Sequence, residues 1–385
     1  MQFAKRFYTI SRRFFASSSS VTSNKKLSSA KKPGNTSANA QQKQVTQDIS
    51  KMPQPHPVLT PLNRKSRVSS IISEPIPSIE KLNRSSSTSC KVELDPELQK
   101  RLPRNILEVS SHFDGNYFIL RPELLNQIYS KIQTNDKMII DGPNGSGKSV
   151  TLMQIYASFK ESIKMDEKKL CLYAPNVHKW TTGYFAYYPQ DSAAEFAQPE
   201  LALEILRLLA ICNKGKEAVE GLEKEISEAQ LDAFNRAIPL YQRTFNQLSE
   251  KGIEITMFLD GVNGLIDENS LTSYLNKDGQ QLPLKSLPLC AQIYKMPRVK
   301  VIGAMTRSNP MLPTCISVPE TIATVTVPNY NADELKRVLQ LYNQLGHCSF
   351  TNKSDQFVAF KSFVSGSNGK KLFKSCEYDS IYYKP

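Results

Sequence analysis

The spacing of apolar residues divides the chain into a polar amino-terminal part and a regular remainder. Residues 21–97 are rich in Ser, Lys, Asn, Gln and Pro and poor in large aliphatic side chains, which favours a disordered extension. From about residue 98 apolar residues become dense, and five short runs have the length of buried strands. These runs are residues 137–141, 169–174, 253–260, 299–306 and 324–327.

Helical spacing of apolar residues fills the segments between these runs. Leu124, Leu125, Ile128 and Ile132 lie on one helical face before the first run. The charged segment Glu217–Ser249 predicts a helical hairpin broken near Pro239, with its Glu and Lys residues on a solvated face. The other predicted helices are Val150–Lys160, Glu200–Cys212 and Asn331–Leu345, the last capped by Asn331. Strands that alternate with helices predict an α/β fold with a parallel sheet.

A phosphate-binding motif joins the first predicted strand to the helix that follows it. Gly142 to Ser149 has the sequence GPNGSGKS and fits G-x-x-x-x-G-K-[ST] at every fixed position. Its glycines let successive backbone N–H groups turn toward phosphate oxygens. Lys148 can reach the β and γ phosphates, and the Ser149 hydroxyl can hold Mg²⁺. The predicted nucleotide-binding residues of this loop are Gly142, Pro143, Asn144, Gly145, Ser146, Gly147, Lys148 and Ser149.

Two later strands end in polar side chains that suit the same site. Residues 253–260 end in Asp260, which we expect at the sheet edge that carries the phosphate loop. Asp260 is therefore the candidate Mg²⁺ carboxylate, acting through a water beside Ser149. Residues 299–306 end in Thr306, which either senses the γ-phosphate or the attacking water, or simply ends the strand.

A second nucleotide-related match does not fit its surroundings. Residues 352–355 read N-K-S-D, which matches the guanine-reading N-K-x-D motif. That motif follows a buried strand in small G proteins, whereas here it follows a predicted helix and a Gly-His-Cys loop. We therefore treat the match as coincidence, and it does not identify the base.

Charge is distributed unevenly along the chain. The formal net charge is +13, but residues 1–95 carry 16 basic and 5 acidic side chains, against 33 and 31 in residues 96–385. A nearly neutral folded region argues against a strongly basic groove across the domain, which makes a nucleic-acid remodeller the weakest functional class. The seven cysteines form no C-x-x-C pair, so buried free thiols are favoured over zinc or disulfides. No apolar stretch is long enough to predict a membrane span.

The amino terminus has the composition of a targeting segment. The first acidic residue is Asp48, and residues 1–20 combine arginines, serines and aromatic side chains. Phe3, Phe7, Ile10 and Phe14 fall on one helical face, which is typical of a mitochondrial transit peptide. A generic basic tail or an RNA-binding arm is the alternative. We expect residues 1–20 to be the transit peptide and the mature chain to lie in the mitochondrial matrix.

Several short motifs, in their order along the chain, resemble the death-associated protein family. Its members are the GTP-binding protein of the mitochondrial small ribosomal subunit. The resemblance spans about residues 98–385. Besides the phosphate loop, it rests on Ala174–Trp180, which contains P-x-x-H-x-W, on Gln198-Pro199, on Asp260–Leu265 and on Val327–Asn331.

The resemblance implies an architecture. It implies an AAA-like P-loop NTPase domain over residues 98–328, with strand order 5-1-4-3-2 and a helical insertion near residues 200–250. Residues 329–385 would form a helical lid. Within the lid, Ser365–Lys370 resembles the start of a sensor helix, from which Lys370 either approaches the γ-phosphate or remains a surface lysine.

The resemblance also implies ligands and partners. GTP or GDP with Mg²⁺ would be bound, with ATP as the open alternative, and the partners would be mitochondrial small-subunit rRNA and ribosomal proteins, without DNA. Gly261 follows Asp260 where many active AAA ATPases carry a catalytic glutamate, and Asp267 and Glu268 lie too far along the chain to replace it. Hydrolysis should therefore be slow or absent. The leading hypothesis is a structural ribosomal protein that binds a purine nucleotide, and the alternative is an active AAA-type or signalling NTPase of the matrix.

Overall fold

The structure is a computed structural model of the 385-residue chain. It describes residues 75–78, 89–113, 115–189, 195–296, 298–306, 318–345, 347–348 and 355–382, with side chains up to Cys376 in the last range. The expected transit peptide, the expected extension up to residue 74 and the first three residues of the N-K-S-D match lie outside these ranges.

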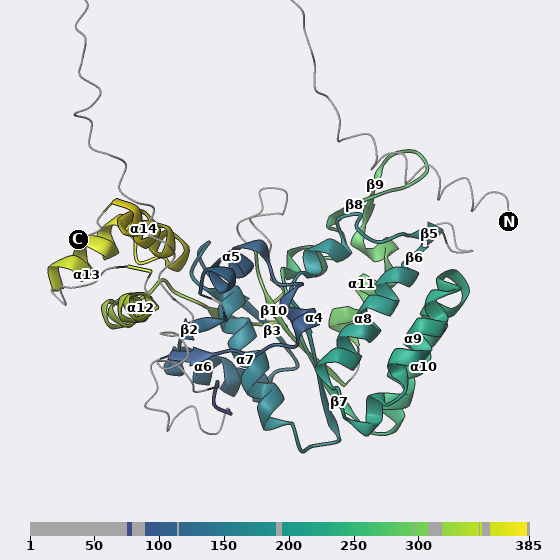
Figure 1. The fold of residues 1–385 in the computed structure, drawn as a ribbon. Helices are drawn as coiled ribbons and strands as arrows, with labels where there is room; N and C mark the ends of the chain where they lie inside the picture. Colours follow the sequence, from purple (N-terminus) through teal and green to yellow (C-terminus); the bar gives the residue numbers. More distant parts are fainter. Residues whose placement is uncertain are drawn as a thin grey trace, which may run out of the picture. The chain divides into compact units, whose positions relative to one another are not determined.

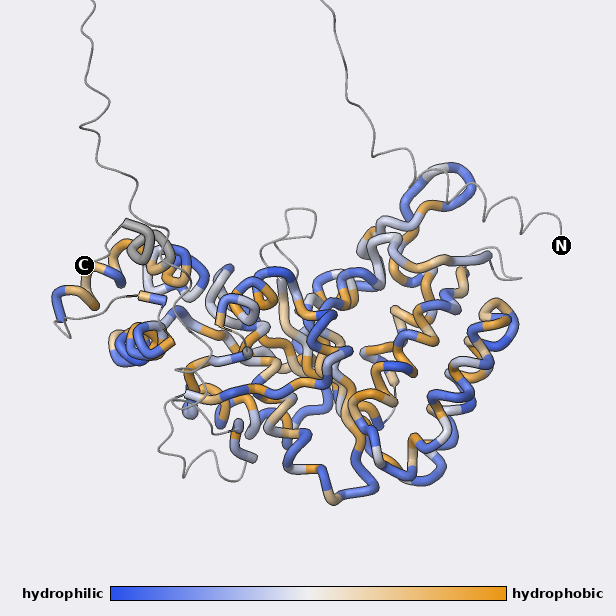
Figure 2. The backbone as a smooth tube through the Cα atoms, in the orientation of Figure 1, coloured by the Kyte–Doolittle hydropathy of each residue, from blue (hydrophilic) through white to orange (hydrophobic). Residues whose placement is uncertain are grey.

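A five-stranded parallel sheet forms the centre of the fold (Figure 1). Its strands lie in the order β11-β3-β10-β7-β4, which confirms the predicted order 5-1-4-3-2. Each strand comes from one of the five apolar runs, and Figure 2 draws the sheet mostly in hydrophobic colours. The strands are β3 (Lys137–Asp141), β4 (Lys169–Ala174), β7 (Glu254–Asp260), β10 (Val299–Ala304) and β11 (Ala323–Thr326).

The register of the sheet brings three strand ends together. Ile140 of β3 pairs with Ala304 of β10, and Ala304 pairs in turn with Asp260 of β7. Helix α7 (Lys148–Ser162) follows β3 and packs against four of the strands, while α6 (Pro122–Thr134) packs against β3 and α7. Helix α8 (Pro199–Cys212) covers β4. The carboxyl ends of β3, β10 and β7 therefore lie at one edge, next to the loop that starts α7.

The helical insertion turns at a different place from the one expected. Helices α9 (Leu222–Gln230) and α10 (Ala233–Glu250) form the hairpin, and the chain reverses at Leu231 and Asp232. Pro239 lies inside α10, so the expected break there is wrong. Proline removes only one helical hydrogen bond, and the apolar face of α10 packs along α8, which keeps the helix continuous across that position.

The folded region begins before residue 98. Strand β1 (Ser89–Lys91) pairs antiparallel with β2 (Tyr117–Ile119), and Pro75 forms a further bridge with Lys91. Ile76, Cys90 and Val92 are buried in the main core. The expected extension therefore overlaps the fold at residues 75–78 and 89–97. The few apolar residues of this segment are too widely spaced to predict a strand. They are buried by elements far along the chain, and the local pattern does not show those contacts.

Three helices follow the sheet and form a second apolar core. They are α12 (Ala332–Gln344), α13 (Asp355–Ser365) and α14 (Gly369–Tyr382). Leu335, Leu339 and Leu372 of these helices pack with Phe113 and Tyr117 from the chain before the sheet. Asn331 caps α12 as predicted, since its Oδ1 accepts a hydrogen bond from the Glu334 N–H at 2.8 Å.

The remaining elements are short. They are α4 (Pro96–Gln99), α5 (Arg104–Phe113), α11 (Pro288–Ala291), β5 (Tyr188–Pro189) with β6 (Phe196–Ala197), β8 (Leu271–Leu275) with β9 (Gln281–Pro283), and the 3-10 turns Val177–Trp180, Glu217–Val219, Val262–Leu265, Leu284–Ser286 and Ile293–Lys295. Six cysteines lie among the described residues, and all six are free and buried, as expected. None of the helices in the described part of the chain has the length and hydropathy of a membrane span.

Candidate nucleotide-binding site

The phosphate loop lies where the sequence predicts it, between β3 and α7. Gly147 precedes α7 with a φ of +99°, and its carbonyl accepts the first helical hydrogen bond from Thr151 N at 2.8 Å. The N-terminus of a helix carries unpaired N–H groups and a partial positive charge, which suits an anion. Strand, loop and helix thus form in the expected order.

A cavity of about 470 Å³ opens on this loop. Six of the eight predicted loop residues, Asn144 to Ser149, line it together with Lys370. The other walls come from α5, β2, α12 and α14, with apolar side chains such as Val109, Phe118 and Phe373. This volume lies within the usual range for small-ligand pockets. The position of α5 could not be predicted, because the amphipathic spacing of a helix does not indicate which cavity it borders.

Lys148 is held at the loop by backbone carbonyls. Its Nζ donates hydrogen bonds to the carbonyl oxygens of Gly142 and Pro143, each at 2.8 Å, and the residue is buried. The positive charge therefore stays beside the loop. Gly142 and Pro143, which do not line the cavity, contribute through these acceptors.

Asp260 and Ser149 meet beside the loop. The Ser149 hydroxyl donates a hydrogen bond to Asp260 Oδ1 at 3.0 Å, which joins the end of β7 to the start of α7. Asp260 is 3% exposed, and its Oδ2 has no hydrogen-bond partner among the described residues. Burial raises the pKa of Asp260 to about 7, against the opposing effects of the Ser149 hydrogen bond and the Lys148 charge. A buried carboxylate oxygen without a partner, beside a hydroxyl, is a donor set that Mg²⁺ and its waters fit.

Gly261, the residue after Asp260, has a backbone conformation that disfavours any side chain. Its φ is +87°, in the left-handed region. A Cβ at this position would lie 3.4 Å from Thr306 Oγ1 and 3.5 Å from the backbone N of His178. Burial, assisted by the Lys179 charge, lowers the pKa of His178. The P-x-x-H-x-W segment, the turn after β7 and the end of β10 thus meet around Gly261.

Asn263 fixes the position of Thr306. Its Oδ1 accepts a hydrogen bond from Thr306 N at 2.7 Å, and its Nδ2 donates to Thr306 O at 3.0 Å. Asn263 is 1% exposed. Thr306 does not line the cavity, but this pair of bonds holds it at the sheet edge beside Gly261. We did not predict this role for Asn263, although it lies in the Asp260–Leu265 motif.

Helix α14 and the residue before it contact the phosphate loop directly. Lys370 N donates a hydrogen bond to Gly145 O at 3.3 Å, so its backbone as well as its side chain lies at the site. Asn368 Nδ2 donates to Asn144 O at 2.6 Å. Gly145 has a φ of +80°, and a Cβ there would collide with Asn368 Oδ1, so the close approach of Asn368 requires glycine. Asn368 was also missed, because it pairs with a loop 224 residues earlier in the chain.

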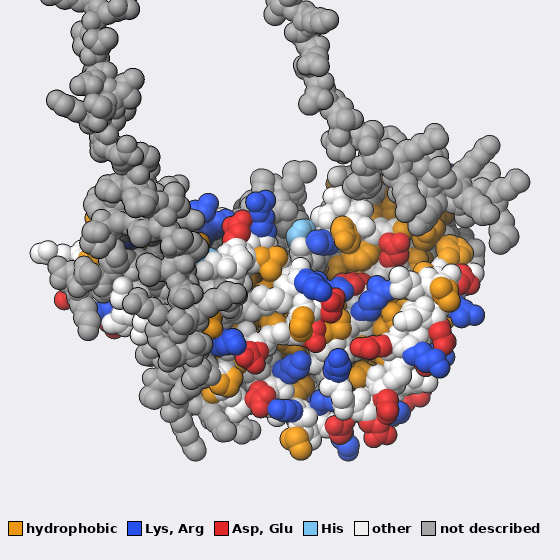
Figure 3. Space-filling view, in the orientation of Figure 1, with side chains coloured by type: hydrophobic (Ala, Val, Ile, Leu, Met, Phe, Trp, Pro, Cys, Tyr) orange, Lys and Arg blue, Asp and Glu red, His pale blue; other side chains and the backbone are white. Residues whose placement is uncertain are grey.

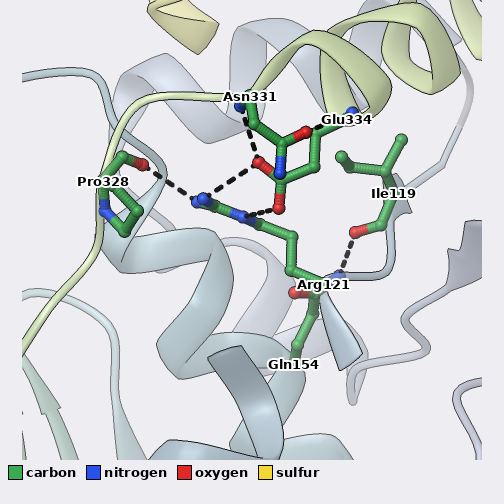
Figure 4. Close-up of polar contacts among 6 residues, drawn as sticks. All are labelled: Ile119, Arg121, Gln154, Pro328, Asn331 and Glu334. Atoms are coloured by element: carbon green, nitrogen blue, oxygen red, sulfur yellow. Dashed lines mark hydrogen bonds and ion pairs between the residues drawn. The ribbon is translucent and has the colours of Figure 1, made fainter. Parts of the chain in front are cut away.

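A buried ion pair joins the first turn of α12 to the residue before α6 (Figure 4). Arg121 Nε lies 2.8 Å from Glu334 Oε1, and Arg121 Nη2 lies 3.2 Å from Oε2. Arg121 Nη1 donates a third hydrogen bond to Pro328 O at 3.1 Å. The same Glu334 carboxylate accepts from Asn331 N at 3.0 Å. This bidentate geometry fixes where α12 starts relative to α6.

Strand order, phosphate loop and carboxylate together define the chain as a P-loop NTPase fold of the α/β class. Residues 122–227 match the family model of mitochondrial ribosomal death-associated protein 3. This match confirms the resemblance to the death-associated protein family, a mitochondrial ribosomal family, that the motifs predict.

Comparisons with whole proteins add distant similarity. No curated protein matches the chain. Among solved structures, a Walker-type ATPase of Pyrococcus abyssi is 12% identical, with a TM-score of 0.40 over 68% of this chain and 70% of that chain. The Drosophila ORC bound to DNA is 14% identical, with a TM-score of 0.34 over 86% of this chain and 64% of that chain.

Proposed function

We propose that the chain is a structural component of the small subunit of the mitochondrial ribosome that binds GTP or GDP, with slow or no hydrolysis. The family match supports the ribosomal role. The observation that carries the nucleotide site is the Ser149–Asp260 pair beside the phosphate loop, with one buried carboxylate oxygen left without a partner among the described residues.

Each part of the loop has a defined task in this proposal. Backbone N–H groups of Asn144 to Ser149 bind the phosphates, and Lys148 exchanges its carbonyl acceptors for phosphate oxygens. Ser149 and Asp260 hold Mg²⁺, Asp260 through a water, and the ion when bound neutralises phosphate charge. Lys370, on the proposed lid, lines the cavity and would approach the γ-phosphate, whereas Thr306, held by Asn263 beside Gly261, would act from the edge of the site. A nucleotide concentration well above the Kd stabilises the fold by several kcal/mol, and the gain is roughly 3 kcal/mol at a concentration of a hundred times the Kd.

Slow hydrolysis follows from what surrounds Gly261. An attacking water needs a group that orients it and accepts its proton. Apart from the adjoining residues, the three atoms nearest to a Cβ built at Gly261 are the Thr306 hydroxyl and the backbone N and Cβ of His178, and none of these belongs to a carboxylate. The nucleotide then serves to hold loop, sheet and lid together.

The charge distribution supports a ribosomal partner set and not a nucleic-acid remodeller. In Figure 3 the Lys and Arg side chains of the described residues lie among Asp and Glu side chains on the face shown. The basic excess lies in residues 1–95. Contacts with rRNA would then come mainly from the extension, and the folded region would contact ribosomal proteins.

The test is a sucrose gradient of matrix extract, probed for this chain, with the bound nucleotide identified by chromatography. We expect the chain in the small-subunit fraction with a guanine nucleotide, and phosphate release no faster than for Lys148→Ala. A chain found only as a soluble pool contradicts the ribosomal role. Turnover that Lys148→Ala abolishes would establish the alternative, an active NTPase.

A further inference from the structure

Helix α13 exposes three large apolar side chains while it buries two polar ones beside Val358. Phe363 is 87% exposed, Phe360 57% and Val364 49%. Lys361 and Ser365, on the other face, are each 1% exposed. Residues spaced by three and four positions share one side of a helix, so the three apolar side chains form one continuous surface, here called the α13 patch.

Polar contacts hold the helix in this orientation. Lys361 Nζ donates hydrogen bonds to Ser375 Oγ at 2.8 Å and Ser375 O at 3.2 Å on α14, and it lies over the Phe357 ring. Within α13, Ser365 Oγ donates to Lys361 O at 2.6 Å, which satisfies this buried hydroxyl. Rotating α13 to bury Phe363 would break the contacts between Lys361 and α14. The fold thus fixes the exposure of the patch, which does not result from loose packing of the helix.

We propose that the α13 patch docks against an uncharged, apolar surface of a neighbouring protein. The exposed residues of α13 after Asp355 are Gln356, Ala359, Phe360, Phe363 and Val364, none of which is charged. The basic residue of this helix, Lys361, is buried against α14. RNA binding by exposed aromatic side chains is accompanied by Lys or Arg beside the phosphates, and the exposed face of α13 has neither, so the chemistry of the patch fits protein better than nucleic acid.

The size of the patch indicates the kind of complex. Aromatic side chains bury roughly 150–250 Å² each, so two phenylalanines and a valine at these exposures offer about 400 Å². A stable interface between two proteins needs about 800 Å² from each partner. A second copy of this chain held by the patch alone would therefore dissociate. The patch fits a partner that other contacts also hold in place, as in a multiprotein assembly, and in this respect the inference rests on the proposed ribosomal function.

Photo-crosslinking in mitochondria tests the proposal with the full-length chain. Phe363 is replaced by p-benzoylphenylalanine, and adducts are analysed in the small-subunit fraction. We expect one adduct with a single protein other than this chain, with a yield that falls at least fivefold when Phe360→Gln is added. Leu231→Gln, which alters a residue 89% exposed on the α9–α10 hairpin, is the matched control and should leave the yield unchanged.

The remaining outcomes overturn the inference. An adduct with RNA, with a second copy or with another segment of this chain would contradict it, as would an adduct insensitive to Phe360→Gln or no adduct. A chain that is missing from the small-subunit fraction overturns the proposed function as well. A chain that co-sediments normally without the expected adduct overturns this inference alone. Unchanged melting temperature and nucleotide binding of Phe360→Gln confirm that the variant is folded.

Discussion

Two buried charged groups of this chain are held in opposite ways. Arg121 and Glu334 form a bidentate ion pair. Arg121 also donates to Pro328 O, and Glu334 also accepts from Asn331 N. Asp260 is buried as deeply at the end of β7, but Ser149 satisfies one of its oxygens, and the other lacks a partner among the described residues.

The difference separates structural from ligand-binding chemistry. A buried charge that is fully paired gains nothing from a ligand, and it fixes the position of its two elements. A buried carboxylate that is half paired raises the free energy of the folded state until a cation or proton completes it. The Arg121–Glu334 pair therefore orients α12, whereas the half-paired Asp260 suits the ligand site that we propose.

Breaking the Arg121–Glu334 ion pair should change the free energy of unfolding more than any other substitution that we propose. Glu334→Gln keeps an acceptor for Asn331 N but leaves the Arg121 guanidinium buried without its counter-charge. We expect the free energy of unfolding to fall by about 3 to 5 kcal/mol, measured by denaturant titration. Glu225→Gln, which breaks the exposed pair with Arg243, is the control and should cost about 0.5 kcal/mol. A loss below about 1 kcal/mol for Glu334→Gln would contradict the structural role.

Removing the half-paired charge of Asp260 should instead stabilise the folded state. The unfolded chain releases the Asp260 proton near its ordinary pKa of 3.8, whereas the folded chain retains it up to a pKa of about 7. Stability therefore falls as the pH rises from 4 to 7 and stays lower above it. Asp260→Asn cannot ionise, so at pH 8 without nucleotide we expect it to be more stable by about 1 to 3 kcal/mol. At pH 4 variant and parent should melt alike, and equal stability at pH 8 would contradict the assignment.

Magnesium should bind in competition with that proton. Because the ion requires the ionised carboxylate, the Mg²⁺-dependent gain in nucleotide affinity should rise about tenfold between pH 6 and 8. Calorimetric titrations with GDP, with and without Mg²⁺, measure this gain. Asp260→Asn provides the control for titration of the nucleotide itself, since it should lose the gain and its pH dependence. A gain that persists in this variant would place the ion elsewhere.

The sequence predicted the parts of the fold that depend on local pattern. The five strands are apolar runs, the phosphate loop is a fixed motif, and the Asn331 cap is a local hydrogen bond. Contacts between distant segments could not be predicted in this way. Arg121 and Glu334 are 213 residues apart, and each alone has the appearance of an ordinary surface charge. The turn at Leu231 was missed because the packing of α10 on α8 overrides the local effect of Pro239.

The smallest expected effect concerns the position after Asp260. Gly261→Glu restores a carboxylate in the sequence, but the left-handed backbone and the nearby Thr306 and His178 prevent a productive placement. We expect a loss of about 1 to 2 kcal/mol in stability, because a side chain at this φ is strained. Gly261→Ala is the matched control and should lose a similar amount. Phosphate release should stay at the background rate for both variants. Faster phosphate release by Gly261→Glu, but not by Gly261→Ala, would contradict this prediction. It would show that a water-activating carboxylate is all that the site lacks and that backbone strain does not prevent catalysis.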